Sequence, residues 1–190
     1  MTTSLIEETE FKKIDFSKNA PAKDEYENCT FTNCIFSNTD ISNIVFSECT
    51  FFGCDLSMAV MKKTAMRNVT FTGCKILGVH FEYCNRLSFS AAFENCILDL
   101  SSFYRLSMKK TRFTNCSLRE VDFAECDLSG SLFDNCDMGK TKFDRTTLKR
   151  ADFRTSYNYS IDPENNNLKQ AKFSAAGIIG LLDKYDIQVM

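Results

Sequence analysis

Cysteine is the most prominent chemically reactive residue of this sequence, with ten copies in 190 residues against a single histidine. Thiolates and imidazoles bind zinc, and thiols pair into disulfides, so both kinds of site are considered first. No two cysteines are separated by two residues, and His80 stands alone, so the ligand spacing of a structural zinc site is missing. We therefore expect no metal site. The cysteines are Cys29, Cys34, Cys49, Cys54, Cys74, Cys84, Cys96, Cys116, Cys126 and Cys136.

Other catalytic and cofactor-binding patterns are missing as well. The sequence lacks the GxSxG and HExxH motifs and a glycine-rich phosphate-binding loop. Its Asp and Glu residues are scattered, and each has a simpler explanation as part of a charged outer surface. We predict a protein that is not an enzyme and that uses no cofactor.

The element that must position these residues is a five-residue repeat. Between Phe93 and Phe153 a bulky apolar residue returns at every fifth position, with Phe in alternate places and Leu or Met between them. This period fits neither the 3.6 residues of a helix nor the alternation of a strand, so it indicates a repeat architecture. Four repeats would make a four-sided coil of twenty residues, and stacked coils would bury a continuous apolar column. The series is Phe93, Leu98, Phe103, Met108, Phe113, Leu118, Phe123, Leu128, Phe133, Met138, Phe143, Leu148 and Phe153.

A first block of the same repeat precedes this one and ends at Phe81. From Phe81 to Phe93 the spacing is twelve residues, two more than two repeats. Residues 84–92 are therefore expected to form a bulge or small outward loop, unless Leu87 is a core residue between two six-residue steps. Together the blocks predict an all-β solenoid over residues 26–173. The first block has its apolar positions at Tyr26, Phe31, Phe36, Ile41, Phe46, Phe51, Leu56, Met61, Met66, Phe71, Ile76 and Phe81.

The cysteines follow the repeat. Each lies two residues before an apolar position, although Cys84 precedes Arg86, where the register fails. Other residues in this place are mostly small, such as Ala59, Ser101 and Thr111. We expect the place to require a small inward side chain, which Cys provides as a small hydrophobe. Ten thiols in a secreted chain would tend to pair, so we predict free, buried, slowly reacting thiols in a reducing cytoplasm.

Charged residues twenty positions apart test the coil length, because stacked coils would place them about 4.8 Å apart. Between Phe93 and Thr155 there are six such pairs, and every one joins opposite charges. Opposite charges on neighbouring strands stabilise a sheet, whereas like charges destabilise it. The charges therefore favour stacked coils of twenty residues. The pairs are Asp99 with Arg119, Arg105 with Glu125, Glu125 with Arg145, Glu120 with Lys140, Asp122 with Lys142, and Asp134 with Arg154.

The N-terminal segment is ambiguous. Residues 1–25 keep the five-residue register at Ile6, Phe11 and Phe16, but a stretch around Pro21 interrupts it. The segment is either a degenerate first coil or a cap, and we favour the cap because an uncovered strand edge promotes aggregation. It lacks the apolar run of a secretory signal peptide, and no stretch of the sequence is apolar enough to predict a membrane span.

The C-terminal segment leaves the repeat and then ends it. Residues 156–167 are rich in turn-forming residues, and the register then returns at Leu168 and Phe173. Residues 174–190 predict a short capping α-helix from about 175 to 185, with Ser174 as its N-cap, and then a short strand. The segment is too apolar to remain exposed. It either caps the last coil or also forms a two-fold dimer interface, with Ile178, Ile179, Leu182, Tyr185, Ile187 and Val189 as the interface residues.

Units such as 126–130 (Cys-Asp-Leu-Ser-Gly) and 151–155 (Ala-Asp-Phe-Arg-Thr) resemble the A(D/N)LXX consensus of pentapeptide-repeat proteins. The resemblance covers about residues 26–173 and implies a right-handed quadrilateral β-helix. The C-terminal segment further resembles that of the Qnr-type quinolone-resistance subgroup, in which it implies a head-to-head homodimer. What the subgroup implies about function is binding to DNA gyrase and topoisomerase IV by mimicry of B-form DNA.

The sequence departs from that subgroup in two ways. Its formal net charge is only −2, whereas DNA carries one charge per about 1.7 Å, and the long loop insertions of drug-protecting members are missing. Two functions therefore stay open. A cytoplasmic topoisomerase-binding DNA mimic requires an acidic stripe along the dimer. A cytoplasmic protein–protein interaction scaffold with an unknown partner is favoured by exposed aromatic residues or an uncharged flat face. Neither predicts direct binding to nucleic acid or membranes.

Overall fold

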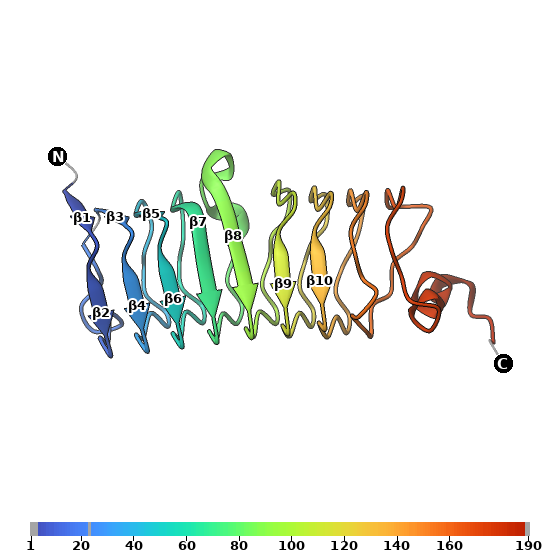
Figure 1. The fold of residues 1–190 in the computed structure, drawn as a ribbon, viewed down its shortest axis with the longest axis horizontal. Helices are drawn as coiled ribbons and strands as arrows, with labels where there is room; N and C mark the ends of the chain where they lie inside the picture. Colours follow the sequence, from blue (N-terminus) through green and yellow to red (C-terminus); the bar gives the residue numbers. More distant parts are fainter. Residues whose placement is uncertain (1–3, 23, 189–190) are drawn as a thin grey trace.

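The computed structural model describes residues 4–22 and 24–188, which form a rod of stacked coils with the two ends of the chain at opposite ends of the rod (Figure 1). This part of the chain contains ten short parallel strands and four 3-10 helices. The strands are β1 (Leu5–Glu7), β2 (Glu10–Lys12), β3 (Glu25–Glu27), β4 (Thr30–Thr32), β5 (Val45–Ser47), β6 (Thr50–Phe52), β7 (Ala65–Thr72), β8 (Phe89–Glu94), β9 (Arg112–Thr114) and β10 (Leu132–Asp134). The 3-10 helices are η1 (Phe81–Tyr83), η2 (Arg86–Ser88), η3 (Gly177–Leu181) and η4 (Asp183–Tyr185).

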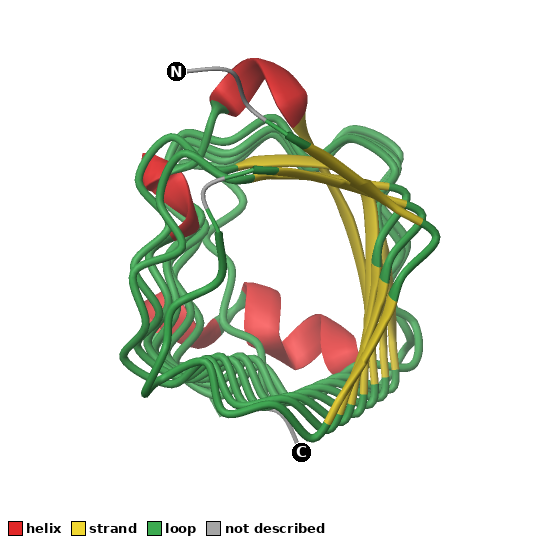
Figure 2. Ribbon diagram, turned by 90° about the vertical axis from the view of Figure 1, so that its left-hand side faces the viewer, coloured by secondary structure: helices red, strands yellow, loops and turns green. Residues whose placement is uncertain are grey.

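Neighbouring coils pair in parallel with a register of twenty residues. Ile6 in β1 lies beside Tyr26 in β3, which lies beside Phe46 in β5. Single bridges continue this register on the sides of the coil without strands, for example between Ile35 and Asp55. The predicted coil length is confirmed. The chain is a parallel four-sided β-solenoid, seen down its axis in Figure 2.

The repeated apolar positions fill the inside of the coils, as predicted. The side chains of Phe93, Phe113 and Phe133 are at most 1% exposed. Their rings stack face to face, with centroids 5.2 and 5.1 Å apart. A second phenylalanine column meets the first edge to face, as between Phe113 and Phe123 at 5.8 Å. Because each ring contacts others above, below and beside it, the columns form one continuous core.

The coil turns its corners through residues in the left-handed region of the backbone map. Asn28, Asn33 and Asn38 have φ angles of 51°, 53° and 55°, and they follow one another at the five-residue spacing. Asn adopts this conformation more readily than other non-glycine residues because its short polar side chain bonds locally. The fifth position of the repeat is therefore selected for backbone conformation, whereas the central position is selected for volume.

Residues 4–22 are the first coil of the stack. Strand β1 pairs with β3, and β2 pairs with β4, in the common register. The rings of Phe11 and Phe31 stack at 4.8 Å. Pro21 does not interrupt the coil, because it falls in the apolar register and is buried. The structure thus shows the first coil and not the favoured cap.

The two extra residues before Phe93 form an outward loop, the first of the alternatives for residues 84–92. The loop contains η2 and rises above the rod between β7 and β8 (Figures 1 and 2). Leu87 is 98% exposed at its tip, so it is not a core residue. The register shifts between the pairs Met66–Phe89 and Val69–Ala91, which restores the stack after the loop.

The C-terminal segment starts as expected, but it is not an α-helix. Ser174 Oγ accepts a hydrogen bond from the backbone N–H of Gly177 at 3.0 Å, and the chain then forms η3 and η4. Gly177 and Gly180 pack directly on Tyr159, where an added Cβ would overlap its hydroxyl and carbonyl oxygens. This close packing accompanies the short 3-10 turns that replace the expected α-helix. The short strand expected after the helix is not formed over residues 186–188.

Candidate protein-binding surfaces

The ten cysteines are buried and unpaired inside the stack. Nine of them donate a hydrogen bond from the thiol to the carbonyl of a core residue in the preceding coil. Cys126 Sγ, for example, lies 2.8 Å from the carbonyl oxygen of Phe103. In the equivalent place Ser131 Oγ donates to the carbonyl of Met108 at 2.9 Å. Cys, Ser and Thr in this place thus supply a donor as well as a small side chain, whereas Ala59 in the same place supplies none. This donor role was not expected from the sequence, although Ser and Thr in the same place signal it.

Burial also keeps the thiols of Cys49, Cys84 and Cys126 protonated. Desolvation raises the pKa of Cys49 to about 11 and the pKa of Cys84 and of Cys126 to about 12. A protonated thiol is a poor nucleophile and a poor metal ligand. Within residues 4–22 and 24–188, no group of three or more His, Cys, Asp or Glu side chains is arranged to hold a metal ion. The surfaces available for binding are therefore on the outside of the rod.

The outside of the rod has four faces, one for each side of the coil. The first face follows β1, β3 and β5, and the second follows β2, β4, β6, β9 and β10. The third face contains the single bridges from Asp15 to Tyr157, and the fourth contains those from Asp40 to Lys142. Each face presents two or three outward side chains per coil.

The first face is divided by charge. Its first three coils carry five glutamates, of which Glu25 forms an ion pair with Arg67 at 3.1 Å. From the sixth coil onward the same face carries mainly lysine and arginine. The face is therefore acidic toward the N-terminal end and basic toward the C-terminal end, so no acidic stripe runs along its whole length. The glutamates are Glu7, Glu8, Glu25, Glu27 and Glu48, and the cations are Lys109, Lys110, Lys149, Arg150 and Lys169.

The second face has an uncharged section. From the second to the fourth coil its outward residues are Thr, Asn, Gly and one Phe. The phenylalanine, Phe52, is 51% exposed. Parallel strands keep this section regular, and an uncharged face is one of the features expected of an interaction scaffold. The residues are Thr30, Thr32, Asn33, Thr50, Phe52, Gly53, Thr70, Thr72 and Gly73.

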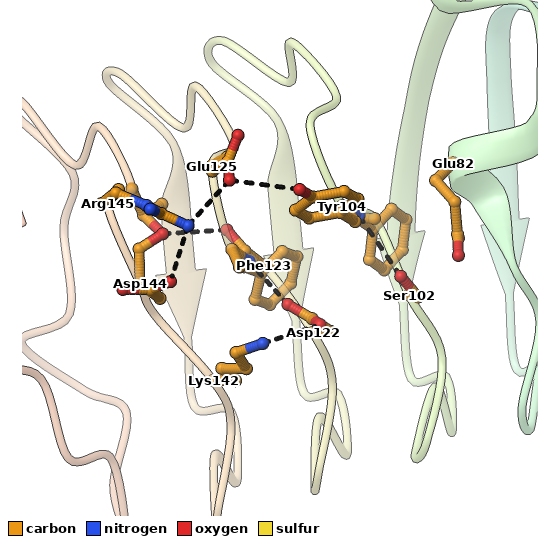
Figure 3. Close-up of polar contacts among 12 residues, drawn as sticks. Glu82, Ser102, Tyr104, Asp122, Phe123, Glu125, Lys142, Asp144 and Arg145 are labelled. Atoms are coloured by element: carbon orange, nitrogen blue, oxygen red, sulfur yellow. Dashed lines mark hydrogen bonds and ion pairs between the residues drawn. The ribbon is translucent and has the colours of Figure 1, made fainter.

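The fourth face carries a network of ion pairs (Figure 3). Glu125 accepts hydrogen bonds from Arg105 Nε at 2.6 Å and from Arg145 Nη2 at 2.9 Å. Lys142 Nζ lies 3.4 Å from Asp122 Oδ2. Three of the pairs expected at a spacing of twenty residues are thus formed. The hydrogen bond from Arg105 lowers the pKa of Glu125 and so favours its ionised form.

A groove of about 470 Å³ runs beside this network. Tyr104 lies in it, and its hydroxyl donates to Glu125 at 3.1 Å. Glu82 Oε1 lies 2.9 Å from His80 Nδ1, whereas Glu82 Oε2 is buried without a hydrogen-bond partner. Figure 3 shows the Glu82 carboxyl apart from the ion pairs of the later coils. Leu100 lines the groove toward the third face.

The residues expected at a dimer interface lie at the C-terminal end of the rod (Figure 1). The end segment is fixed to the turn-rich residues 156–167, because Lys184 Nζ contacts Asp162 at 2.6 Å and the Tyr185 hydroxyl donates to Glu164 at 2.8 Å. Leu182 is partly buried, and Val189 lies outside the described residues. Four apolar or aromatic side chains remain 48–57% exposed there: Ile178, Ile179, Tyr185 and Ile187.

Solved structures with the same architecture are known. Two solved structures of QnrB1, a plasmid-mediated fluoroquinolone resistance protein, match the chain from end to end. A trypsin-treated variant matches with a TM-score of 0.63 and 20% identity, covering 98% of this chain and 100% of that chain. The full-length form matches with a TM-score of 0.61 and 18% identity, covering 97% and 100%. At this identity the likeness shows a common fold.

Sequence comparison gives the family. No match is found among curated proteins. Among the described residues, no helix combines the length and apolar character needed to cross a membrane. The pentapeptide repeat region matches residues 25–90 and 88–162, which is most of the chain. With the five-residue core and the twenty-residue coil, this match shows that the chain belongs to the pentapeptide repeat family.

Proposed function

We propose that this protein is a non-enzymatic, cytoplasmic homodimer that binds a type II topoisomerase, either DNA gyrase or topoisomerase IV, as a partial mimic of DNA. The observation that carries the proposal is the row of glutamates on the first face. Five carboxylates over three coils of about 4.8 Å amount to one per roughly 3 Å of rod. B-form DNA carries one charge per about 1.7 Å, so the row approaches DNA in charge density over this part of the rod.

The C-terminal end supports the homodimer. Exposed apolar side chains gather there on a segment that is fixed to the last coil. A second copy related by a two-fold axis would cover the same surface on both chains. Such a dimer is a rod of double length in which the acidic stripe is limited to one glutamate row toward each far end. The end-to-end likeness to a fluoroquinolone resistance protein supports the choice of a fluoroquinolone target as the partner.

A DNA gyrase supercoiling assay, with and without a fluoroquinolone, tests this function. We expect inhibition or drug protection at micromolar protein. The triple variant Glu25→Gln, Glu27→Gln, Glu48→Gln should lose the effect, because it removes most of the acidic row without changing its shape. A matched control, Glu94→Gln, changes one carboxylate on the second face and should keep the effect. No effect of the natural protein at tens of micromolar would contradict the proposal.

A second candidate function is a protein–protein interaction scaffold with another partner. The uncharged section of the second face, with Phe52 half exposed, favours it. In that case gyrase is unaffected, and Phe52→Ser weakens binding to the true partner while leaving stability unchanged. Co-purification of a defined partner with the natural protein, and its loss from Phe52→Ser, is the measurement that decides for the scaffold.

A further inference from the structure

The left-handed corner positions are almost all polar, with two exceptions. Of the 24 non-glycine residues with positive φ in residues 4–22 and 24–188, 22 are polar or charged. The exceptions are Met58, with a φ of 58°, and Leu100, with a φ of 62°. Asn38, one coil before Met58 at the same corner, is the usual kind of residue there. Unfavourable backbone conformations that persist in a folded protein collect at functional sites, so these two residues need an explanation.

Met58 and Leu100 flank a glycine. The backbone N–H of Met58 bonds to the carbonyl of Leu77 in the next coil, and that of Gly78 bonds to Asp99 in the coil of Leu100. Met58, Gly78 and Leu100 therefore occupy one corner in three successive coils. The sulfur of Met58 leans over the glycine, where an added Cβ would lie 2.6 Å from it. Gly78 has no side chain, so the Met58 side chain lies in the space that a Cβ there would need.

These side chains form an exposed apolar surface on the edge between the third and fourth faces. Met58 and Leu100 are 54% and 55% exposed. Val60, next to Met58 on the fourth face, is exposed to a similar extent. We refer to Met58, Val60, Gly78 and Leu100 as the apolar corner. Apolar side chains that are half exposed on an unfavourable backbone contribute little to the stability of the isolated protein. A partner that covers them would remove apolar surface from water, which favours binding.

The apolar corner continues into the groove of the fourth face, because Leu100 lines that groove. Two carboxylates in the groove lack a lysine or arginine partner among the described residues. Glu82 contacts only His80 and keeps one buried oxygen without a partner, and Glu120 makes no ion pair. The other carboxylates of the groove already contact lysine or arginine. The surface is therefore apolar at the corner and negatively charged in the groove.

We propose that the apolar corner and the groove bind a segment of a partner protein in which an apolar side chain is followed by lysine or arginine. The apolar side chain packs against the exposed side chains of Met58 and Leu100. The cation enters the groove and complements the charge of Glu82 and Glu120. This inference rests on the proposed function only in that the protein acts by binding another protein. It places the contact away from both the glutamate row and the C-terminal end.

Asparagine at the two corners separates binding from stability. Because these corners accept asparagine readily, the double variant Met58→Asn, Leu100→Asn should unfold at the same temperature as the natural protein or higher. The probe is a fluorescent peptide of alternating leucine and lysine, with anisotropy as the readout. We expect the double variant to bind this peptide about ten-fold more weakly or worse. Leu87→Asn is the matched control, since it removes a more exposed leucine outside the corner and should leave the affinity unchanged.

Two related peptides test the chemistry of the partner. Replacing lysine by glutamate, or leucine by serine, should abolish most of the binding. In the natural protein the methyl signal of Met58 should shift when the leucine–lysine peptide is added. Equal affinity of the natural protein and the double variant, or an unmoved Met58 signal, would overturn the proposal. If the peptide binds at the corner while gyrase is not bound by the natural protein, the docking site stands and the topoisomerase is the wrong partner.

Discussion

The inside of the coil and its corners use the same repeat under opposite rules. Inside, a position requires a bulky apolar residue, and Phe93, Phe113 and Phe133 repeat without variation at a spacing of twenty. At the corners only the backbone conformation is fixed, so asparagine, lysine, arginine, glutamate and glycine all occur. Packing decides the first case, and the positive φ decides the second. The interior therefore determines stability, and the corners and faces are free to determine binding.

The same difference separates residues of one type. Phe113 is fully buried between two stacked rings, whereas Phe52 projects from the second face. Both belong to a strand of the stack, and they differ only in the side of the strand on which the side chain lies. Mutations of inner and outer side chains of the same type test this difference.

The largest effect is expected from removing an inner ring. Phe113→Ala should lower the free energy of unfolding by about 3–5 kcal/mol, because it leaves a cavity between Phe93 and Phe133. Phe52→Ala should change it by less than about 0.5 kcal/mol, as surface substitutions do. Guanidinium unfolding followed by circular dichroism measures both. Similar losses for the two variants would show that the inner column does not dominate stability.

A smaller effect is expected from the cysteines. Cys126→Ala removes one donor to the carbonyl of Phe103 and should cost about 0.5–1.5 kcal/mol, because that carbonyl keeps its hydrogen bond from the backbone N–H of Leu106. Cys126→Ser keeps a donor and should recover part of this loss. Thr146 already fills the same place one coil later and donates to the carbonyl of Phe123 at 2.9 Å. If Ala and Ser destabilise equally in the same unfolding measurement, the thiol acts through its volume alone.

The interior was predictable from the sequence because one physical requirement fixes each of its positions. The five-residue period gave the coil length, the core and the burial of the cysteines, all without a structure. Charged residues such as Arg105, Glu125 and Arg145 also fell where the period placed them. The exception was the donor role of the cysteines, because a thiol, a hydroxyl and a methyl group look alike when a place is judged by size alone.

The ends and corners were not predictable in the same way. The apolar pattern of the C-terminal segment suited an α-helix, but Gly177 and Gly180 pack against Tyr159, a residue that the sequence pattern does not connect with them. The apolar corner brings together Met58, Gly78 and Leu100, which are twenty and twenty-two positions apart, and the Met58 side chain lies over the glycine. Such features depend on which side chains meet across coils, and the period does not specify that.

The smallest effect, and the clearest test of the outer surface, is expected from the ion pairs of the fourth face. Glu125→Gln removes the charge that Arg105 and Arg145 share, but these side chains lie in water, so the unfolding midpoint should fall only slightly and only at low salt.

The pKa of Glu125 is lowered in the folded state by Arg105. Its contribution is therefore present above the ordinary glutamate pKa and is lost as the pH falls through the folded value. The unfolding midpoints of the variant and the natural protein should accordingly converge at acidic pH and at high salt. The control Glu94→Gln should have the midpoint of the natural protein under all of these conditions. A difference in midpoint that persists in acid would mean that Glu125 stabilises the fold through packing. Packing would then contribute to stability on the fourth face as well as in the interior.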